Sequence, residues 1–321
     1  MRTVFSHITA LRLSRADSAP FIDRRPAARS FALPDSAPDA GQVEGLGLPP
    51  EAIDRPHHVL IERERRRRSA EHVIIHSTAG NTLPHGSILR IGDGGQAHSC
   101  SPELLFPQVA SLVQRFNLVR IGMELCGSYA LSPSHPSGFY ARDPLTTVSR
   151  MQSYLGKVAG LKGTKQARWA LQYVLPRSAS PRETVVAMLF ELPCAFGGCG
   201  LGKPSLNHPV VVTQSIGGVR RRQTYRVDLF WPEAKLGLEY DSDLEHTGAS
   251  RIARDARRRN ALESMGITML TITNRQVKSL WEFNKLAHVV AGRLGRQIQP
   301  RCKDYRTRQR QLHTLLIEDG L

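Results

Sequence analysis

Two short apolar segments joined by a tight turn constrain the fold of this chain more than any other feature. Residues 227–231 (VDLFW) and 236–241 (LGLEYD) both read as β-strands, and the intervening PEAK sequence has the composition of a turn. When this hairpin is folded about its centre, Asp228 lies directly opposite Glu239. The sequence therefore predicts a β-hairpin that brings two carboxylates together.

A third carboxylate, Asp241, is expected on the same face as Asp228 and Glu239, because side chains alternate between the two faces of a strand. Directly opposed residues lie about 5 Å apart at Cβ, where like charges repel each other. A divalent cation would relieve this repulsion, and oxygen ligands suit Mg²⁺ or Mn²⁺. For Asp241 an ordinary ion pair is the alternative, because Arg226 lies opposite it in the same pairing.

The chain carries a large positive charge. It has 44 Lys and Arg against 28 Asp and Glu, which gives a formal net charge of +16 and a pI of about 10.3. Such a surplus indicates a polyanionic partner, and nucleic acid is a better candidate than an acidic membrane surface. No apolar run approaches the length of a membrane span, so no membrane contact is expected.

The five cysteines are odd in number and scattered along the chain. This pattern argues against a disulfide framework and for a reducing compartment. The first residues lack the continuous apolar core of a signal peptide, so a cytoplasmic protein is expected. Cys194 and Cys199 flank the sequence AFGG and read either as half of a zinc knuckle or as incidental thiols in a loop.

Apolar runs and breakers divide the chain into four parts. Residues 1–56 are rich in Pro, Ala, Arg and Asp and are expected to be loose, apart from a short helix over 6–13. Residues 57–176 read as a mixed β and helical domain, in which Ser101-Pro102-Glu103 opens a helix with Ser at the cap and Pro at the first position. Residues 177–299 form the second expected domain, and 300–321 a basic, frayed tail.

The second domain is expected to follow the order helix, strand, strand, strand, helix, strand. Its first helix opens at Ser180, and its second is predicted over 250–264, ahead of a single long helix over 275–294. The strands are predicted at 209–213, 227–231, 236–241 and 267–273.

This order and its acidic residues together resemble the PD-(D/E)xK nuclease superfamily, in its restriction-endonuclease-like fold. The closer likeness is to very-short-patch repair (Vsr) endonucleases and related bacterial endonuclease-domain proteins. It covers about residues 180 to 280, and its matches are, in chain order, Glu183, the VDLFWP run at 227–232, Glu239-Tyr240-Asp241, His246, and the RDARR run at 254–258. We therefore expect an α/β protein whose C-terminal αβββαβ core is restriction-endonuclease-like and follows an N-terminal mixed α+β domain.

The resemblance implies metal-dependent hydrolysis of DNA phosphodiester bonds, with Mg²⁺ or Mn²⁺ as the cofactor. Asp228, Glu239 and Asp241 are the expected metal ligands, and Glu183 and His246 are the expected supporting catalytic residues. One position departs from the superfamily pattern: Asp241 stands where the usual Lys follows the second acid by two residues. The group that would activate the attacking water is therefore left open.

Two of these residues have structural explanations that need no catalysis. Ser180 and Glu183 have the spacing of a capping box, in which the Glu returns to the amide at the start of its helix. His246 follows Glu245 in an expected loop, where it is either a general base or phosphate contact, or simply a solvent-exposed side chain.

A basic helix follows the hairpin. Its expected nucleic-acid contacts are Arg251, Arg254, Arg257 and Arg258. The forked guanidinium donors of Arg suit phosphate oxygens, whereas the alternative is an ordinary solvated helix face. The same two readings apply to the Arg runs at 63–68 and 220–222.

The segment 57–130 also resembles regions of abortive-infection AbiE-type antitoxins, mainly through Ser101-Pro102-Glu103 after a β-rich stretch. This likeness implies a toxin–antitoxin or phage-defence setting, with a partner protein, but assigns no chemistry. The sequence thus predicts a metal-dependent DNA endonuclease of phage defence or DNA repair. The alternative is a DNA-binding regulator or antitoxin-like protein that keeps the fold without turnover.

Overall fold

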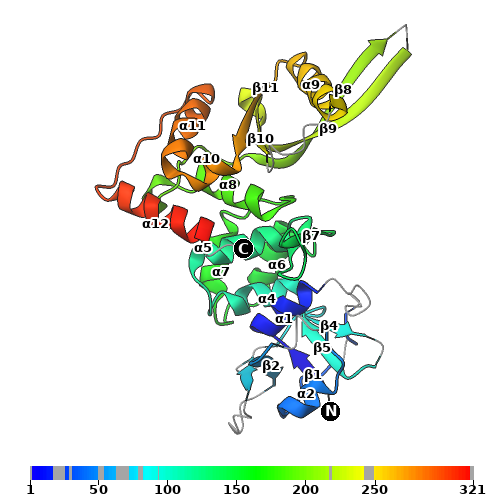
Figure 1. The fold of residues 1–321 in the computed structure, drawn as a ribbon. Helices are drawn as coiled ribbons and strands as arrows, with labels where there is room; N and C mark the ends of the chain where they lie inside the picture. Colours follow the sequence, from blue (N-terminus) through cyan, green and yellow to red (C-terminus); the bar gives the residue numbers. More distant parts are fainter. Residues whose placement is uncertain are drawn as a thin grey trace. The chain divides into compact units, whose positions relative to one another are not determined.

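The computed structural model describes residues 2–16, 26–28, 31–49, 54–62, 72–78, 82–92, 94–216, 219–241 and 249–318. The chain divides into two compact units. Unit 1 contains Met1–Cys126 and Ala130–Val174, and unit 2 contains Gly127–Tyr129 and Leu175–Leu321. The protein is therefore a mixed α/β chain of two units, which are described separately below (Figure 1).

Unit 1 is built on a five-stranded mixed sheet with the order β3-β2-β1-β5-β4. Strand β1 pairs antiparallel with β2 and parallel with β5, β2 pairs parallel with β3, and β4 pairs antiparallel with β5. The strands are β1 (Thr3–Phe5), β2 (His57–Ile61), β3 (Val73–Ser77), β4 (Ile88–Ile91) and β5 (Ala97–Cys100).

Helices complete unit 1. The helix predicted to open at Ser101 is confirmed, because the Ser101 hydroxyl accepts a hydrogen bond from the Leu104 N–H and Pro102 is its first residue. Phe5, Val59 and Leu13 belong to a buried apolar cluster that joins the sheet to the first helix. The helices are α1 (His7–Ser14), α2 (Ala40–Glu44), α4 (Pro102–Val109), α5 (Arg115–Leu125), α6 (Val148–Lys157) and α7 (Thr164–Leu171). Strands β6 (Tyr129–Leu131) and β7 (Phe139–Ala141) form a separate two-stranded sheet.

Unit 2 contains a four-stranded sheet with the order β11-β10-β9-β8. Helix α8 (Pro181–Glu191) precedes the sheet in the chain, and helix α9 (Ala249–Glu263) lies between its last two strands. The strands are β8 (Ser205–Ile216), β9 (Val219–Trp231), β10 (Leu236–Asp241) and β11 (Thr268–Thr273). Strand β10 pairs antiparallel with β9 and parallel with β11.

The predicted hairpin is present with the predicted register. Leu236 pairs with Trp231 and Leu238 pairs with Leu229, and a 3₁₀ turn over Pro232–Ala234 connects β9 to β10. Lys235 closes the turn at φ +47°, in the left-handed region that reverses the chain. Leu229, Trp231 and Leu238 are buried, so the apolar face of the hairpin faces the core of unit 2.

Strands β8 and β9 are much longer than predicted. They pair antiparallel along their length, from the pair of Ser205 with Phe230 to the pair of Ile216 with Val219. Together they form a two-stranded ribbon that extends past helix α9 (Figure 1). In the sequence only 209–213 and 227–231 read as strands, because the polar residues of the rest of the ribbon lack the apolar alternation of a half-buried strand.

Three further expectations need correction. Thr3–Phe5 is a strand in the centre of the unit 1 sheet, within a stretch expected to be loose apart from one short helix. The long final helix is interrupted at Ser279, which ends α10 (Asn274–Lys278) and caps α11 (Leu280–Arg293). The prediction of a frayed tail is wrong for α12 (Tyr305–Glu318), since Leu312 and Leu316 in that helix are buried.

None of the described helices is both long enough and apolar enough to cross a lipid bilayer.

Candidate functional site

The candidate site lies in unit 2 at the point where α8, β9 and β10 meet. Asp228, on β9, comes directly before the last paired residue of the hairpin, Leu229. Its Oδ2 accepts a hydrogen bond from the backbone N–H of Tyr240 at 2.9 Å. Burial raises the pKa of Asp228 above its usual range, while the Tyr240 N–H and the Arg258 guanidinium offset part of that rise. The hydrogen bond from Tyr240 therefore fixes the Asp228 side chain of β9 to the backbone of β10.

Glu183 supplies the second buried carboxylate, from the first turn of α8. Burial raises the pKa of Glu183 to about 7, and the nearby Asp228 carboxylate adds to the rise. Hydrogen bonds from the Ala179 N–H, the Asn207 amide and the Ser180 hydroxyl act in the opposite direction. The two acids are thus close enough to repel each other electrostatically.

The capping explanation for Glu183 is partly correct. The Ser180 hydroxyl accepts from the Glu183 N–H at 3.2 Å, as a helix cap does. The Glu183 carboxylate, however, accepts from the amide of Ala179 at 2.9 Å and from the Ser180 hydroxyl at 3.0 Å, rather than from the Ser180 amide. Glu183 therefore stabilises the start of α8 and also faces Asp228.

Asn207, on β8, is a residue that the sequence analysis missed. Its amide nitrogen donates to Glu183 Oε2 at 2.6 Å and to the Arg177 carbonyl at 2.9 Å. Asn207 has φ +45°, a left-handed conformation that costs backbone strain in a strand and that Asn tolerates better than most residues. The only sequence signal was an Asn directly before His208-Pro209, which reads as a strand boundary.

Glu239, on β10, is held by a basic residue. Its carboxylate forms an ion pair with Arg258 of α9, and the same Arg258 guanidinium donates to the Arg226 carbonyl. Arg258 was predicted as a nucleic-acid contact, but here it binds an acid of the candidate site. A cavity of about 50 Å³ lies beside the pair and has room for more than one water molecule. Thr271, which pairs with Glu239 across β10 and β11, also lines this cavity.

The remaining predicted residues lie at the edge of the site or outside the described residues. Asp241 is the last residue of β10, is half-buried and pairs with Thr273 in the parallel ladder. Arg257 is exposed on α9. His246 lies outside the described residues, as do the side chains of Arg251 and Arg254 and the Arg run at 63–68.

The four acids do not converge as a closed metal site. We consider groups of three or more His, Cys, Asp or Glu residues whose ligand atoms all lie within 4.8 Å of one another. Within the described parts of the chain, such a group is formed by three histidines in unit 1. Glu183, Asp228, Glu239 and Asp241 do not form such a group. Asp228 instead lies near enough to Glu183 to raise the pKa of that group. On its other side, it comes one residue before the Leu229 and Leu238 pair, so the hairpin register directs it toward Glu239.

Comparisons with known proteins leave the chemistry open. The chain is 28% identical over 148 residues to uncharacterized proteins from two strains of Mycobacterium tuberculosis, CDC 1551 / Oshkosh and ATCC 25618 / H37Rv. The aligned region covers 46% of this chain and 49% of each relative, so the chain spans about half the length of the curated relatives it matches. No model of a protein family matches the chain. No solved structure matches it either.

Proposed function

We propose that this protein is a metal-dependent endonuclease that hydrolyses DNA phosphodiester bonds at the carboxylates of unit 2. The observation that carries the proposal is the position of Asp228 on β9. Asp228 is partly buried, and it lies near enough to Glu183 to raise the pKa of that carboxyl group. Extending the hairpin register by one residue from the Leu229 and Leu238 pair places Asp228 opposite Glu239. The Asp228 charge raises the pKa of Glu183, and a cation bound beside these carboxylates would relieve the repulsion between them. A binding site for a positive ion is the simplest explanation of their placement.

The donor set suits Mg²⁺ or Mn²⁺. Carboxylate oxygens are the ligands that these hard cations prefer, and the partly buried Asp228 carboxylate has its Oδ2 already oriented by the Tyr240 N–H. Asp228 and Glu239 would hold the ion, with Asp241 at the end of the same strand as a third oxygen donor. Such an ion supplies charge neutralisation at a scissile phosphate and lowers the pKa of a bound water.

The other residues position this pair. The Glu183 carboxylate accepts hydrogen bonds of 2.6 to 3.0 Å from Asn207 and from two residues at the start of α8, and these contacts fix its position in the site. Arg258 holds Glu239 through an ion pair, so binding of a cation at Glu239 requires the guanidinium to move off that carboxylate. A mobile guanidinium beside the site then becomes a donor for a phosphate oxygen.

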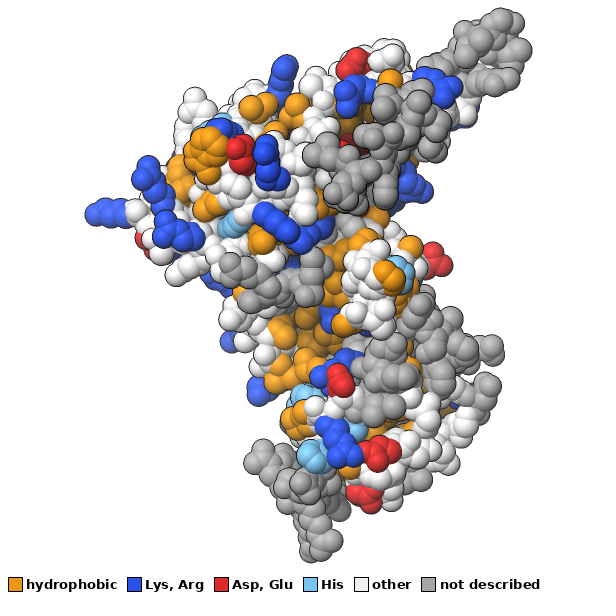
Figure 2. Space-filling view, viewed as in Figure 1, with side chains coloured by type: hydrophobic (Ala, Val, Ile, Leu, Met, Phe, Trp, Pro, Cys, Tyr) orange, Lys and Arg blue, Asp and Glu red, His pale blue; other side chains and the backbone are white. Residues whose placement is uncertain are grey.

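The surface of unit 2 offers contacts for a polyanion. Arg257 and Arg259 are exposed on α9, and Arg220 and Arg222 are exposed on β9 in the long ribbon. A two-stranded ribbon has the dimensions that fit the major groove of DNA. On the face drawn in Figure 2, Lys and Arg side chains are spread widely over the described surface, and acidic side chains are few.

The order of elements supports the assignment to a restriction-endonuclease-like core. Helix α8, strands β8, β9 and β10, helix α9 and strand β11 follow one another in the αβββαβ order that the PD-(D/E)xK resemblance implies. The acids fall on β9 and β10, where that resemblance expects them. Phage defence or DNA repair, with or without a partner protein, is the biological setting that we propose for this activity.

Plasmid cleavage tests the proposal. Purified full-length protein should nick or linearise supercoiled plasmid in Mg²⁺ and should stop on addition of EDTA. Asp228→Asn should be inactive, because it removes a negative charge from the centre of the site. Glu233→Gln is the matched control, since Glu233 is an exposed acid in the turn of the same hairpin. Cleavage that survives in Asp228→Asn would reject this active site.

A DNA-binding regulator without turnover is the second candidate function. It is favoured by the Arg258–Glu239 ion pair, which neutralises one of the acids internally, and by Asp241 in place of the usual Lys. A mobility shift that survives EDTA, without cleavage of plasmid, single-stranded DNA or RNA, would support it over the enzyme. In both cases DNA binding should weaken steeply with salt, because phosphate contacts release counterions.

A further inference from the structure

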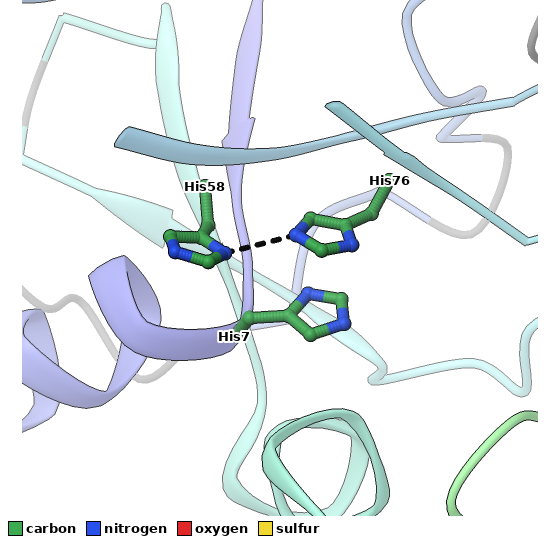
Figure 3. Close-up of side chains that lie close together, drawn as sticks. All are labelled: His7, His58 and His76. Carbon is green, nitrogen blue, oxygen red and sulfur yellow. Dashed lines mark hydrogen bonds between the residues drawn. The ribbon is translucent and has the colours of Figure 1, made fainter. Parts of the chain in front are cut away.

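Three histidines from separate parts of unit 1 meet beside its sheet. His7 begins helix α1 directly after strand β1, His58 lies on β2, and His76 lies on β3. Because the sheet order is β3-β2-β1, these residues come from three neighbouring strands or strand ends. One ring nitrogen of each lies within 4.8 Å of those of the other two. Figure 3 shows the rings gathered on one side of the strands.

The rings contact one another closely. His58 Nδ1 and His76 Nε2 share a hydrogen bond of 2.9 Å (Figure 3). The His7 and His76 rings are stacked with centroids 3.5 Å apart, and the His58 and His76 centroids are 5.1 Å apart. His7 and His58 are buried, whereas His76 is partly exposed, so the cluster is open to solvent on the β3 side.

Burial lowers the pKa values of all three imidazoles. Burial lowers the pKa of His7 to about 2 and that of His76 to about 4, and in each case the neighbouring His58 adds to the effect. Burial also lowers the pKa of His58, with Arg12 and His57 contributing. Lys162 lies near enough to lower the pKa of both His7 and His76 further.

The backbone around His7 is arranged to hold this side chain. His7 has φ +49°, a left-handed conformation that costs strain and persists only where its surroundings impose it. Its N–H donates to Gln108 Oε1 at 3.3 Å, and its Nδ1 lies 3.0 Å from the Ser6 hydroxyl. The His58 N–H donates to the Thr9 hydroxyl at 2.8 Å, which fixes β2 against α1.

We propose that His7, His58 and His76 form a binding site for a transition-metal ion of the Zn²⁺ class, separate from the carboxylate site of unit 2. Imidazole nitrogen suits Zn²⁺, Cu²⁺ and Ni²⁺, whereas Mg²⁺ prefers oxygen. Three protein ligands leave one position of a tetrahedral ion open for water or an anion, and Lys162 would attract an anion to that region.

Metal binding requires a small rearrangement. Zn–N bonds are about 2.0 to 2.1 Å, so the ring nitrogens of the three histidines would have to turn toward one common point. Whichever of His58 and His76 carries the proton of their shared hydrogen bond would hold it on its other ring nitrogen instead, so that His58 Nδ1 and His76 Nε2 would both present lone pairs. The His7 ring turns out of its stack with His76 about its side-chain bonds. These are side-chain motions, and the strands that carry His58 and His76 stay paired.

The experiment uses full-length protein without an affinity tag. After equilibration with Zn²⁺ and removal of free metal, elemental analysis should find a bound ion that is lost in His58→Ala and in His76→Gln. His76→Gln is included because it alters a partly exposed residue on an edge strand, where the fold tolerates change. His98→Gln is the matched control, since His98 is a buried histidine on β5 of the same sheet that packs against Phe31.

Co²⁺ substitution identifies the ligands. Nitrogen ligation gives visible d–d bands without the near-ultraviolet charge-transfer band of thiolates, so it separates this site from Zn²⁺ bound by Cys194, Cys199 or Cys302. The proposal is supported if these bands vanish in His76→Gln and persist in His98→Gln. It is overturned if wild-type protein binds no Zn²⁺, or if His76→Gln binds as much Zn²⁺ as wild type. Asp228→Asn should retain this ion, so the outcome is independent of the nuclease proposal.

Discussion

Glu191 offers a sharp test of how burial acts in unit 2. It is the last residue of helix α8, and its side chain is only 3% exposed. Within the described residues neither carboxylate oxygen has a hydrogen-bond partner, although Lys203 Nζ lies 3.8 Å from Oε1. Burial raises the pKa of Glu191 from 4.5 to about 8, and Lys203 lowers it only in part. The perturbation that we consider is Glu191→Gln, which keeps the shape and removes the titration.

The raised pKa fixes the sign of the pH dependence. Between pH 4.5 and about 8 the folded protein keeps the Glu191 proton that the unfolded chain releases. This contribution to stability is therefore fully present below the unfolded pKa and is lost as the pH rises through the folded one. A rise of this size corresponds to about 5 kcal/mol at most, of which about 4 kcal/mol falls between pH 5 and 9. Relaxation around the charged form reduces the expected change to about 2 to 4 kcal/mol.

The assay is urea unfolding at a series of pH values from 5 to 9, followed by tryptophan fluorescence. Trp231 and Trp281 lie in the same unit as Glu191 and contribute to the signal. The free energy of unfolding of Glu191→Gln minus that of wild type should increase by about 2 to 4 kcal/mol across this range. Glu263→Gln, which removes an exposed acid on α9, is the control. A difference between Glu191→Gln and wild type that stays flat with pH would refute the reasoning.

Three further predictions concern packing and charge. Leu229→Ala removes a fully buried side chain of the hairpin and should lower the free energy of unfolding by about 2 to 5 kcal/mol in urea titrations, with no loss expected from the exposed Val211→Ala. Gly198→Ala places a Cβ 2.0 Å from the Leu192 carbonyl oxygen and should lower the Tm markedly, whereas Gly292→Ala, which meets open space, should not. Glu124→Gln removes the charge of a buried carboxylate that pairs with the partly exposed Arg15 (2.6 Å) and should cost about 3 to 5 kcal/mol, measured by calorimetry; an unchanged Tm would contradict this.

The hairpin was predictable because its information is local. Alternation between Val227 and Trp231, the PEAK turn and a second alternating run determine both the pairing and its register, and Asp228 lies where that register places it. The helix start at Ser101 was predictable for the same reason, since the cap and the following Pro are adjacent in the chain.

The remaining features depend on contacts between distant segments. Asn207 meets Glu183 across 24 residues, and no periodicity links the two. His7, His58 and His76 meet because β1, β2 and β3 are neighbours in the sheet, an order that composition and spacing do not encode. The ion pair of Arg258 with Glu239 depends on how α9 packs against β10, whereas the sequence shows only a basic helix.

The rate of DNA cleavage under single-turnover conditions tests the central claim most directly. With saturating Mg²⁺, Asp228→Asn should be slower than wild type by at least about a hundredfold, since losing a few kcal/mol of transition-state stabilisation has that effect. Glu233→Gln should cleave at the wild-type rate, and all three proteins should bind the same DNA. Equal rates for wild type and Asp228→Asn, or an absence of Mg²⁺-dependent cleavage by wild type, would contradict the account.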